Sequence, residues 1–406
     1  MRLEAFRKEF PLLETFSYLD SASNSLVPKR VLLAVNEFYE QCGGVSNRGL
    51  HKITVKASQE VKNARATVAD FLNAEDPKEI IFTQNTASAT SMVAYGLPLK
   101  ENCKIVTTKL AHHSSLLPWM RAANKRRVML SFLGLTPEGL LDEETATEII
   151  TGGDCKVLVI TLTPMVHGHI TPLNKLIKLA KEVEALIFID VTRATGHIPL
   201  NVHDLQCDFL VFAGNVGLFA PQGTGILYAN QEVLKDLEPL FVGSGTVSKV
   251  TPTGCEFVET PERFEGGVLN VGGIVGLNKA LEIIKELGLE TIRDYEKSLT
   301  KRLLDDLSKI EKVKIYGSKD VEKRIGIVGF NVERFNPHDI ALFLDEFANI
   351  GVRSGKMCSH LLVESLGKKE REEGIVQASL HCYNNLDDIE KLVSTIKMMI
   401  EELSKN

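Results

Sequence analysis

Short apolar runs alternate with longer amphipathic segments along most of the chain. We expect strands at the apolar runs 80–82, 104–107, 128–133, 156–161 and 186–190. Between them apolar residues recur at helical spacing, and we expect helices at 57–72, 114–125, 142–150 and 173–184. This alternation indicates a mostly parallel sheet with helices on both faces. Ligands of such sheets bind at the carboxyl ends of the strands, where His112 and Asp190 fall.

The pattern changes near residue 265. A long helical stretch is expected over 274–310 with a break at Gly288, followed by strands near 313–316, 325–331 and 375–380. Further helices are expected at 337–350 and at 386–403, where apolar residues line one side. We therefore predict a large α/β domain at 15–262. A smaller α+β domain should combine 263–406 with 1–14, where we expect a short amphipathic helix that ends at Pro11.

Composition narrows the class of protein. The chain has 406 residues, 44% of them hydrophobic and 25% charged, with a formal net charge of −6. This balance suits a globular protein of two domains and lacks the basic surface that nucleic-acid binding requires. No apolar run approaches the roughly 20 residues of a membrane span, and the N-terminus has no apolar core of a signal peptide. We expect a cytoplasmic protein that binds neither nucleic acid nor membranes.

The cysteines give little sign of a shared site. There are seven, an odd number, and no two stand at the close spacing of a zinc site. We therefore expect no metal site and mostly buried, reduced thiols. Cys358 is the exception, because the nearby Arg353 and Lys356 favour the reactive thiolate form.

The segment 208–228 carries the most specific motif. An apolar run at 209–212 leads into a turn rich in glycine and proline, and a second strand follows at 225–228. The segment resembles the hairpin of class V aminotransferases, above all their selenocysteine lyase/cysteine desulfurase branch. In that hairpin a lysine forms the Schiff base with pyridoxal phosphate (PLP). The matching frame is Asp208, Phe209, Phe212, Gly214, Pro221, Gly223, Gly225 and Tyr228.

The lysine position of this hairpin holds Val216, and the histidine before it is replaced by Asn215. A valine has no amine, so it cannot form an imine with an aldehyde. The resemblance nevertheless extends over about residues 16–403, with further matching motifs at 18–28, 47–51, 111–119, 263–273 and 353–358. It implies the PLP-dependent transferase fold type I and a homodimer, in which 263–270 reaches across to the neighbouring subunit.

The resemblance also assigns candidate site residues. His112 matches the histidine that stacks on the PLP ring, and Asp190 matches the carboxylate that pairs with the pyridine nitrogen. Thr86 lies in a polar turn between a strand and a helix, where free N–H groups favour a phosphate. Cys358 matches the persulfide-forming cysteine of the desulfurases, and Arg353 matches an arginine for the substrate carboxylate.

Other positions depart from the family pattern. Arg193 replaces a glutamine that contacts the phenolic oxygen of PLP. Further polar contacts of the family are replaced by Met165, Ala213, Val268 and Gln377. Because a buried carboxylate needs a partner, our hypothesis is that Arg193 pairs directly with Asp190.

These departures lead to three hypotheses about function. We favour a degenerate cysteine desulfurase-like protein without covalent PLP, a non-catalytic or sulfur-accepting component of sulfur or iron–sulfur metabolism. Its partner would be a sulfur acceptor or an iron–sulfur assembly protein. Alternatively, the chain is an enzyme that holds PLP non-covalently, or another ligand in the same cleft. In a third alternative it is a conventional desulfurase in which Lys356 or Lys249 reaches the aldehyde.

Overall fold

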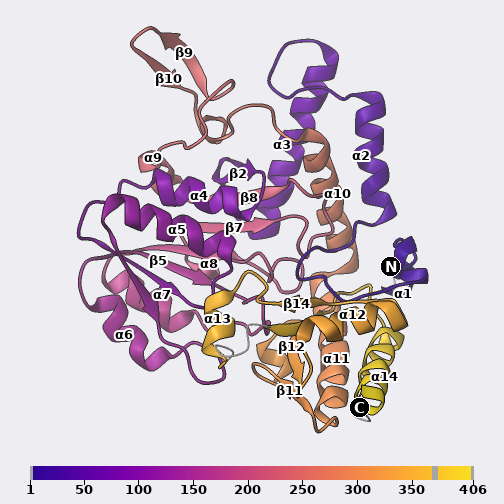
Figure 1. The fold of residues 1–406 in the computed structure, drawn as a ribbon. Helices are drawn as coiled ribbons and strands as arrows, with labels where there is room; N and C mark the ends of the chain where they lie inside the picture. Colours follow the sequence, from indigo (N-terminus) through magenta and orange to yellow (C-terminus); the bar gives the residue numbers. More distant parts are fainter. Residues whose placement is uncertain (1–2, 368–373, 404–406) are drawn as a thin grey trace.

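The computed structural model describes residues 3–367 and 374–403 (Figure 1). Residues 1–2, 368–373 and 404–406, which fall in the predicted small domain, lie outside the described residues. The described chain contains a large sheet between layers of helices and a smaller sheet with its own helices. Within this part of the chain, no helix is long and apolar enough to cross a membrane.

The large sheet has seven strands in the order β2-β8-β7-β6-β5-β3-β4. Its strands are β2 (Ile80–Thr83), β3 (Lys104–Thr108), β4 (Met129–Leu133), β5 (Cys155–Thr161), β6 (Leu186–Asp190), β7 (Phe209–Ala213) and β8 (Gly225–Ala229). β8 runs antiparallel to both of its neighbours, whereas β7, β6, β5, β3 and β4 pair in parallel. The mostly parallel sheet predicted from the sequence is therefore confirmed.

Helices cover both faces of this sheet, because side chains of each strand point alternately to opposite sides. Val157 and Val159 pack in one apolar cluster with α4 (Thr86–Gly96) and α5 (His113–Arg126). Leu158 and Ile160 belong to the cluster on the other face. The helices of that face are α3 (Lys52–Leu72), α6 (Glu143–Thr151), α7 (Asn174–Glu182) and α10 (Val271–Leu287).

The smaller sheet is antiparallel, with the strand order β11-β12-β15-β14. Its strands are β11 (Val313–Ile315), β12 (Ile327–Val332), β14 (Arg353–Gly355) and β15 (Ile375–Ser379). The helices nearby are α11 (Leu289–Ser308), α12 (Pro337–Ala348), α13 (His360–Ser365) and α14 (Leu386–Leu403). The predicted helix break occurs at Gly288, whose φ of +80° separates α10 from α11.

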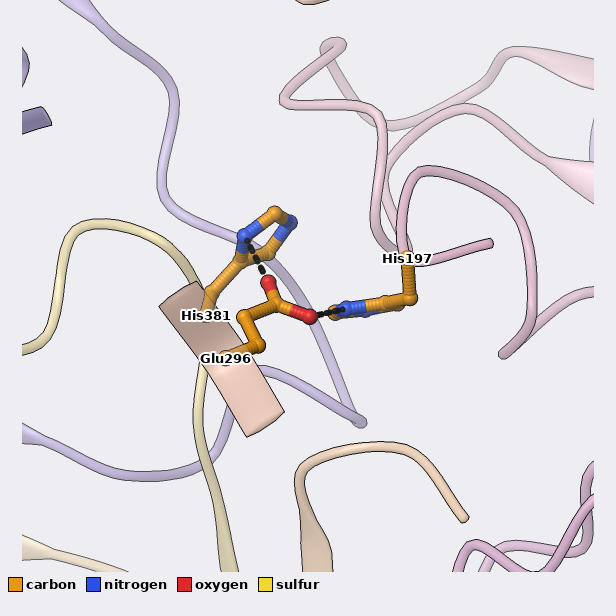
Figure 2. A group of neighbouring side chains, drawn as sticks. All are labelled: His197, Glu296 and His381. Atoms are coloured by element: carbon orange, nitrogen blue, oxygen red, sulfur yellow. Dashed lines mark hydrogen bonds and ion pairs between the residues drawn. The ribbon is translucent and has the colours of Figure 1, made fainter. Parts of the chain in front are cut away.

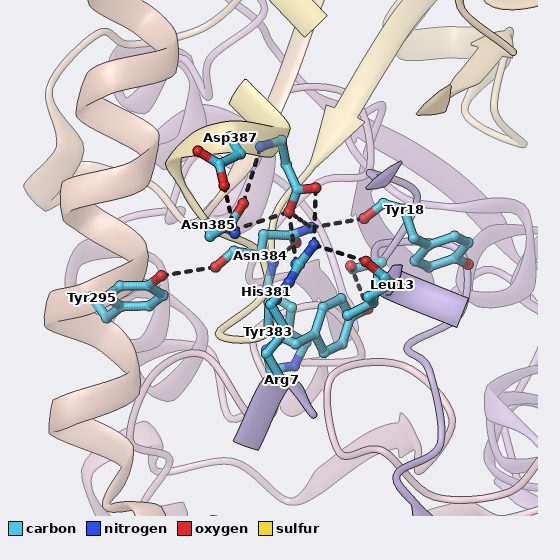
Figure 3. A network of polar contacts seen from close by, with 11 residues as sticks. Arg7, Leu13, Tyr18, Tyr295, His381, Tyr383, Asn384, Asn385 and Asp387 are labelled. Atoms are coloured by element: carbon cyan, nitrogen blue, oxygen red, sulfur yellow. Dashed lines mark hydrogen bonds and ion pairs between the residues drawn. The ribbon is translucent and has the colours of Figure 1, made fainter. Parts of the chain in front are cut away.

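The N-terminal segment forms a shorter helix than the one that we expected to end at Pro11. It contains α1 (Leu3–Arg7) and a separate 3-10 turn, η1 (Pro11–Glu14), because Pro11 has no N–H to continue a helix. Arg7 then joins this segment to the end of the chain: Nη1 donates to Asp388 Oδ2 at 2.8 Å and to the Tyr383 carbonyl at 2.6 Å (Figure 3).

α2 (Lys29–Gln41) contributes Val31 and Phe38 to the same apolar cluster as α10. The other elements are short. They are β1 (Ser17–Tyr18), which pairs with β13 (Ile350–Gly351), and η2 (Pro77–Glu79), α8 (Val202–Leu205), α9 (Gln231–Asp236), η3 (Glu262–Phe264) and η4 (Val321–Lys323). β9 (Val247–Thr251) and β10 (Gly254–Phe257) form a hairpin that projects away from the large sheet (Figure 1).

Candidate active site

Asp190 ends β6 near the middle of the large sheet, at the carboxyl end of the strand as predicted. Its side chain is buried, and Oδ1 accepts hydrogen bonds from the Thr192 backbone N–H at 2.9 Å and from Thr192 Oγ1 at 2.5 Å. Oδ2 is also buried but has no hydrogen-bond partner. The site therefore contains a buried carboxylate oxygen with unused acceptor capacity.

Thr192 extends this network toward α4. Its Oγ1 lies 3.0 Å from Oγ1 of Thr86, the first residue of that helix. Asn85 caps the helix through Oδ1, which accepts from the Ser88 N–H at 2.9 Å. Thr86 and Asp190 are thus linked through Thr192, which our reading of the sequence did not single out because Thr192 belonged to no recognised motif.

His112 caps the N-terminus of α5, and its Nδ1 accepts from the Ser114 N–H at 3.1 Å. The neutral ring therefore carries its proton on Nε2. Burial is the main reason that the pKa of His112 falls to about 2, and the cations Arg193 and Arg353 lower it further. His112 thus presents a neutral imidazole among cationic groups.

Arg193 does not form the direct pair with Asp190 that we expected. The two side chains are not joined by an ion pair within 4.0 Å, and Arg193 Nε instead donates to Met165 Sδ at 2.7 Å. Asp190 still attracts Arg193 at longer range, but burial dominates and lowers the pKa of Arg193 to about 10. The carbonyl of Met165 in turn accepts a hydrogen bond from Gln377 Nε2. The hypothesis of a direct pair is wrong.

Arg353 and Cys358 do come together. Arg353, the first residue of β14, donates from Nη1 to Ser23 Oγ at 2.6 Å and from Nη2 to Cys358 Sγ at 3.6 Å. The Cys358 carbonyl accepts from the His113 N–H at 2.8 Å, which joins the cysteine loop to the start of α5. Met357 and Cys358 both have left-handed backbones, with φ of +49° and +52°. Such conformations are costly for residues with side chains and often occur at functional sites.

The turn after β7 carries Asn215 and Val216. Val216 is only 6% exposed, and its N–H donates to the Ala213 carbonyl at 3.1 Å. The Asn215 carbonyl accepts from the Ser25 N–H at 2.8 Å, and Asn215 Nδ2 donates to Asn24 at 3.0 Å. The turn is thus fixed through its backbone and carries a buried aliphatic side chain at position 216, which we matched to the lysine of the family motif from the sequence.

Other residues considered from the sequence lie outside this cluster. Val268 is 66% exposed. Lys249 is on the projecting hairpin, where its Nζ lies 3.4 Å from Glu256 Oε1. Lys356 Nζ lies 3.9 Å from Glu364 Oε1. Within the described residues, no lysine makes a hydrogen bond or ion pair with His112, Asp190, Arg193, Arg353 or Cys358.

The site fits part of a PLP molecule. The free Oδ2 of Asp190 suits the ring nitrogen, the neutral ring of His112 offers an aromatic face, and Thr86 stands at a helix N-terminus. The covalent anchor does not fit, because the side chain of Val216 is aliphatic. These residues therefore match non-covalent binding of the ring, while a Schiff base to position 216 is chemically impossible.

Comparisons with known proteins show the family and the fold. A family model described as aminotransferase class-V matches residues 17–392. The chain is similar to a probable cysteine desulfurase of Pyrococcus abyssi, with 37% identity over 402 residues and 98% of each chain covered. It is also similar to the apo structure of a cysteine desulfurase from Thermococcus onnurineus NA1, with a TM-score of 0.94, 37% identity and 99% of each chain covered.

A more distant similarity shows the fold alone. A lysine-to-alanine mutant of C-DES, with glycine covalently linked to its PLP cofactor, matches with a TM-score of 0.82 and 19% identity. The match covers 96% of this chain and 98% of that one. The α/β fold expected for PLP-dependent transferases is thereby confirmed.

Proposed function

The chain belongs to the class-V aminotransferase family, and we propose that it is a cysteine desulfurase-like protein that accepts sulfur at Cys358 without a lysine-bound cofactor. The observation that carries this proposal is the contrast between two positions of one site. Val216 is a buried aliphatic residue, whereas Cys358 keeps a hydrogen bond from Arg353. The group for covalent PLP chemistry is missing, and the group for sulfur transfer is retained.

Sulfur acceptance at Cys358 requires no oxidant or reductant. The Cys358 thiolate would attack the outer sulfur of a donor persulfide, so that a new S–S bond forms while the donor's S–S bond breaks. The donor leaves as a thiolate and takes up a proton. Arg353 Nη2, 3.6 Å from Sγ, would stabilise the negative charge of Cys358 before the transfer and of its persulfide afterwards.

A second function rests on Asp190. Its buried Oδ2 has no partner, which favours a cleft that holds PLP non-covalently or takes another ligand with a donor at that point. Bound PLP would supply an electron-accepting ring. Asp190 would hold the ring nitrogen, His112 would cover one face, and Arg193 would add a cation nearby. Lysine-dependent proton transfer would be absent in this alternative too.

One set of measurements separates these functions. The purified chain is mixed with PLP, reduced with borohydride and passed through gel filtration. Retention without covalent trapping supports non-covalent binding, whereas covalent trapping at a native lysine would refute the proposal. A second sample is treated with cysteine persulfide and analysed by peptide mass spectrometry. We expect Cys358 to gain one sulfur atom, Cys358→Ser to lose this product, and the control Cys255→Ser, at an exposed cysteine, to retain it. A Cys358 peptide without added sulfur would overturn the proposal.

Several finer statements remain predictions. We propose a homodimer and a sulfur donor or acceptor protein as partner, and cytoplasmic localisation is part of the same hypothesis. We also propose that residues 15–262 form the large domain and that 263–406, together with 1–14, form the small domain. The contact of Arg7 with Asp388 supports assignment of the N-terminal segment to the small domain.

A further inference from the structure

His197, Glu296 and His381 meet in the interior, and none of the three belongs to a motif identified in the sequence (Figure 2). His197 follows β6, Glu296 lies on α11, and His381 follows β15. The three side chains are buried, with 4%, 0% and 0% exposure. Figure 2 shows the carboxylate of Glu296 between the two imidazole rings. The cluster therefore joins segments of the large and the small sheet regions.

The two sides of the carboxylate differ. Glu296 Oε2 lies 2.8 Å from His197 Nδ1 in hydrogen-bond geometry. Glu296 Oε1 lies 3.0 Å from His381 Nδ1, yet it has no hydrogen-bond partner. At this length the contact is not a hydrogen bond, because His381 Nδ1 presents no donor to the oxygen. An ion bound between Glu296 Oε1 and His381 Nδ1 would give this oxygen a partner.

The tautomer of His381 supports the same reading. Nε2 lies 2.9 Å from the Gly217 carbonyl, which can only accept, so Nε2 carries a proton. In the neutral ring Nδ1 then carries a lone pair, which accepts from the Cys382 N–H at 2.8 Å, so an ion bound at Nδ1 would displace this hydrogen bond. A histidine that binds a metal commonly donates its other N–H to a backbone carbonyl in this way.

The backbone holds the acceptor of that bond in place. Gly217, in the turn that carries Val216, crosses the loop at Thr195–Gly196 so closely that a Cβ on Gly217 would lie 1.9 Å from the Thr195 carbonyl oxygen. A Cβ on Gly196 would lie 2.0 Å from the Gly217 oxygen. The turn after β7 therefore positions His381 through the Gly217 carbonyl. It also positions His197, because the loop that carries His197 packs directly against this turn.

From this geometry we propose that His197, Glu296 and His381 form a binding site for one divalent transition-metal ion of the zinc class. Two nitrogens and one carboxylate oxygen are a ligand set that suits Zn²⁺ or Co²⁺ and leaves one position for a further ligand. All three ligand atoms lie within 4.8 Å of one another. Ligands around a tetrahedral ion are about 3.4 Å apart, so the contacts of 2.8 and 3.0 Å need to open by only about half an ångström.

The ion would take the place of the proton that His197 Nδ1 shares with Glu296, and that proton would move to Nε2 of the same ring, so that His197 stays neutral. Through Glu296 and His381, the ion would hold α11 and the loop after β15 in place beside the turn that carries Val216. This inference does not depend on the proposed sulfur chemistry. The reason the sequence gave no sign of it is that the three ligands come from distant segments without the spacing of a metal motif.

The test uses the full chain produced with Co²⁺ in the growth medium and purified without chelators. We expect about one Co²⁺ per chain and the intense visible ligand-field bands of a low-coordinate site. Glu296→Gln and His381→Asn should each lose both signals. The control His167→Asn, at another buried histidine, should keep them.

The wild-type result alone decides the proposal, even where a variant fails to fold. Folded wild-type chain without bound Co²⁺ and without ligand-field bands would overturn it, and the cluster would then be held by a proton only. A metal that binds equally well to the folded Glu296→Gln chain would also overturn it. As a further positive readout, removal of the Co²⁺ by a chelator should lower the melting temperature of the wild type but not of Glu296→Gln.

Discussion

Arg353 Nη2 donates to Cys358 Sγ at 3.6 Å, so the guanidinium at the start of β14 and the thiol of the next loop form one unit. Substitution of Arg353 by Gln removes the cation while keeping a hydrogen-bonding side chain. Because hydrogen bonds to charged groups contribute about 1.5–3 kcal/mol, we expect Cys358 to react with iodoacetamide about tenfold more slowly at neutral pH. Peptide mass spectrometry of both cysteines measures this, with exposed Cys255 as the internal control. Equal slowing at Cys255, or no slowing at Cys358, would contradict the proposed unit.

Val216→Lys tests whether position 216 faces the cofactor cleft. A lysine there should form an aldimine with added PLP, seen as visible absorbance that borohydride converts to a stable adduct. The matched control is Leu342→Lys on α12, at a position that is 58% exposed and outside the candidate site, where we expect no adduct. If Val216→Lys folds and stays unmodified while binding PLP, the assignment of this position is wrong.

His112 gives the chain a defined pH dependence. Burial lowers the pKa of His112 to about 2 in the folded state, against about 6.5 when unfolded. Below pH 6.5 the His112 ring binds a proton in the unfolded chain but not in the folded chain. The contribution of His112 to the free energy of unfolding is therefore fully present above pH 6.5 and declines as the pH falls below it. The slope approaches about 1.4 kcal/mol per pH unit well below pH 6.5. Urea unfolding between pH 7 and 5 should show a smaller loss for His112→Asn, since asparagine keeps the helix cap without titrating. Equal losses would contradict the folded pKa.

Arg7 connects the N-terminal segment to a buried carboxylate. Asp388 is 2% exposed, so Arg7→Ala would leave its charge with only the donors of Asn384 and Asn385. We expect the free energy of unfolding to fall by about 2–3 kcal/mol, less than for a fully buried pair because Arg7 is 21% exposed. Denaturant unfolding measures this, and Lys235→Ala at an exposed pair should change little. A loss no larger than that of Lys235→Ala would show that the N-terminal contact adds no stability.

The large sheet and its helices could be predicted from the sequence, because short apolar strands and amphipathic helices leave distinct periodicities. The end of the first helix was predicted less well: we expected it at Pro11, whereas the helix ends at Arg7. The sequence also showed that position 216 has no amine, since this depends on the side chain alone. Asp190 was expected at a strand end, and the structure places it there.

Only the tertiary structure decided which partners these residues meet. Arg193 was expected to turn toward Asp190, but packing against Met165 directs its guanidinium elsewhere and leaves Asp190 Oδ2 without a partner. His197, Glu296 and His381 meet because the crossing of two loops and the position of α11 bring distant segments together. Local pattern fixes which elements form, whereas contacts between distant side chains depend on how those elements pack.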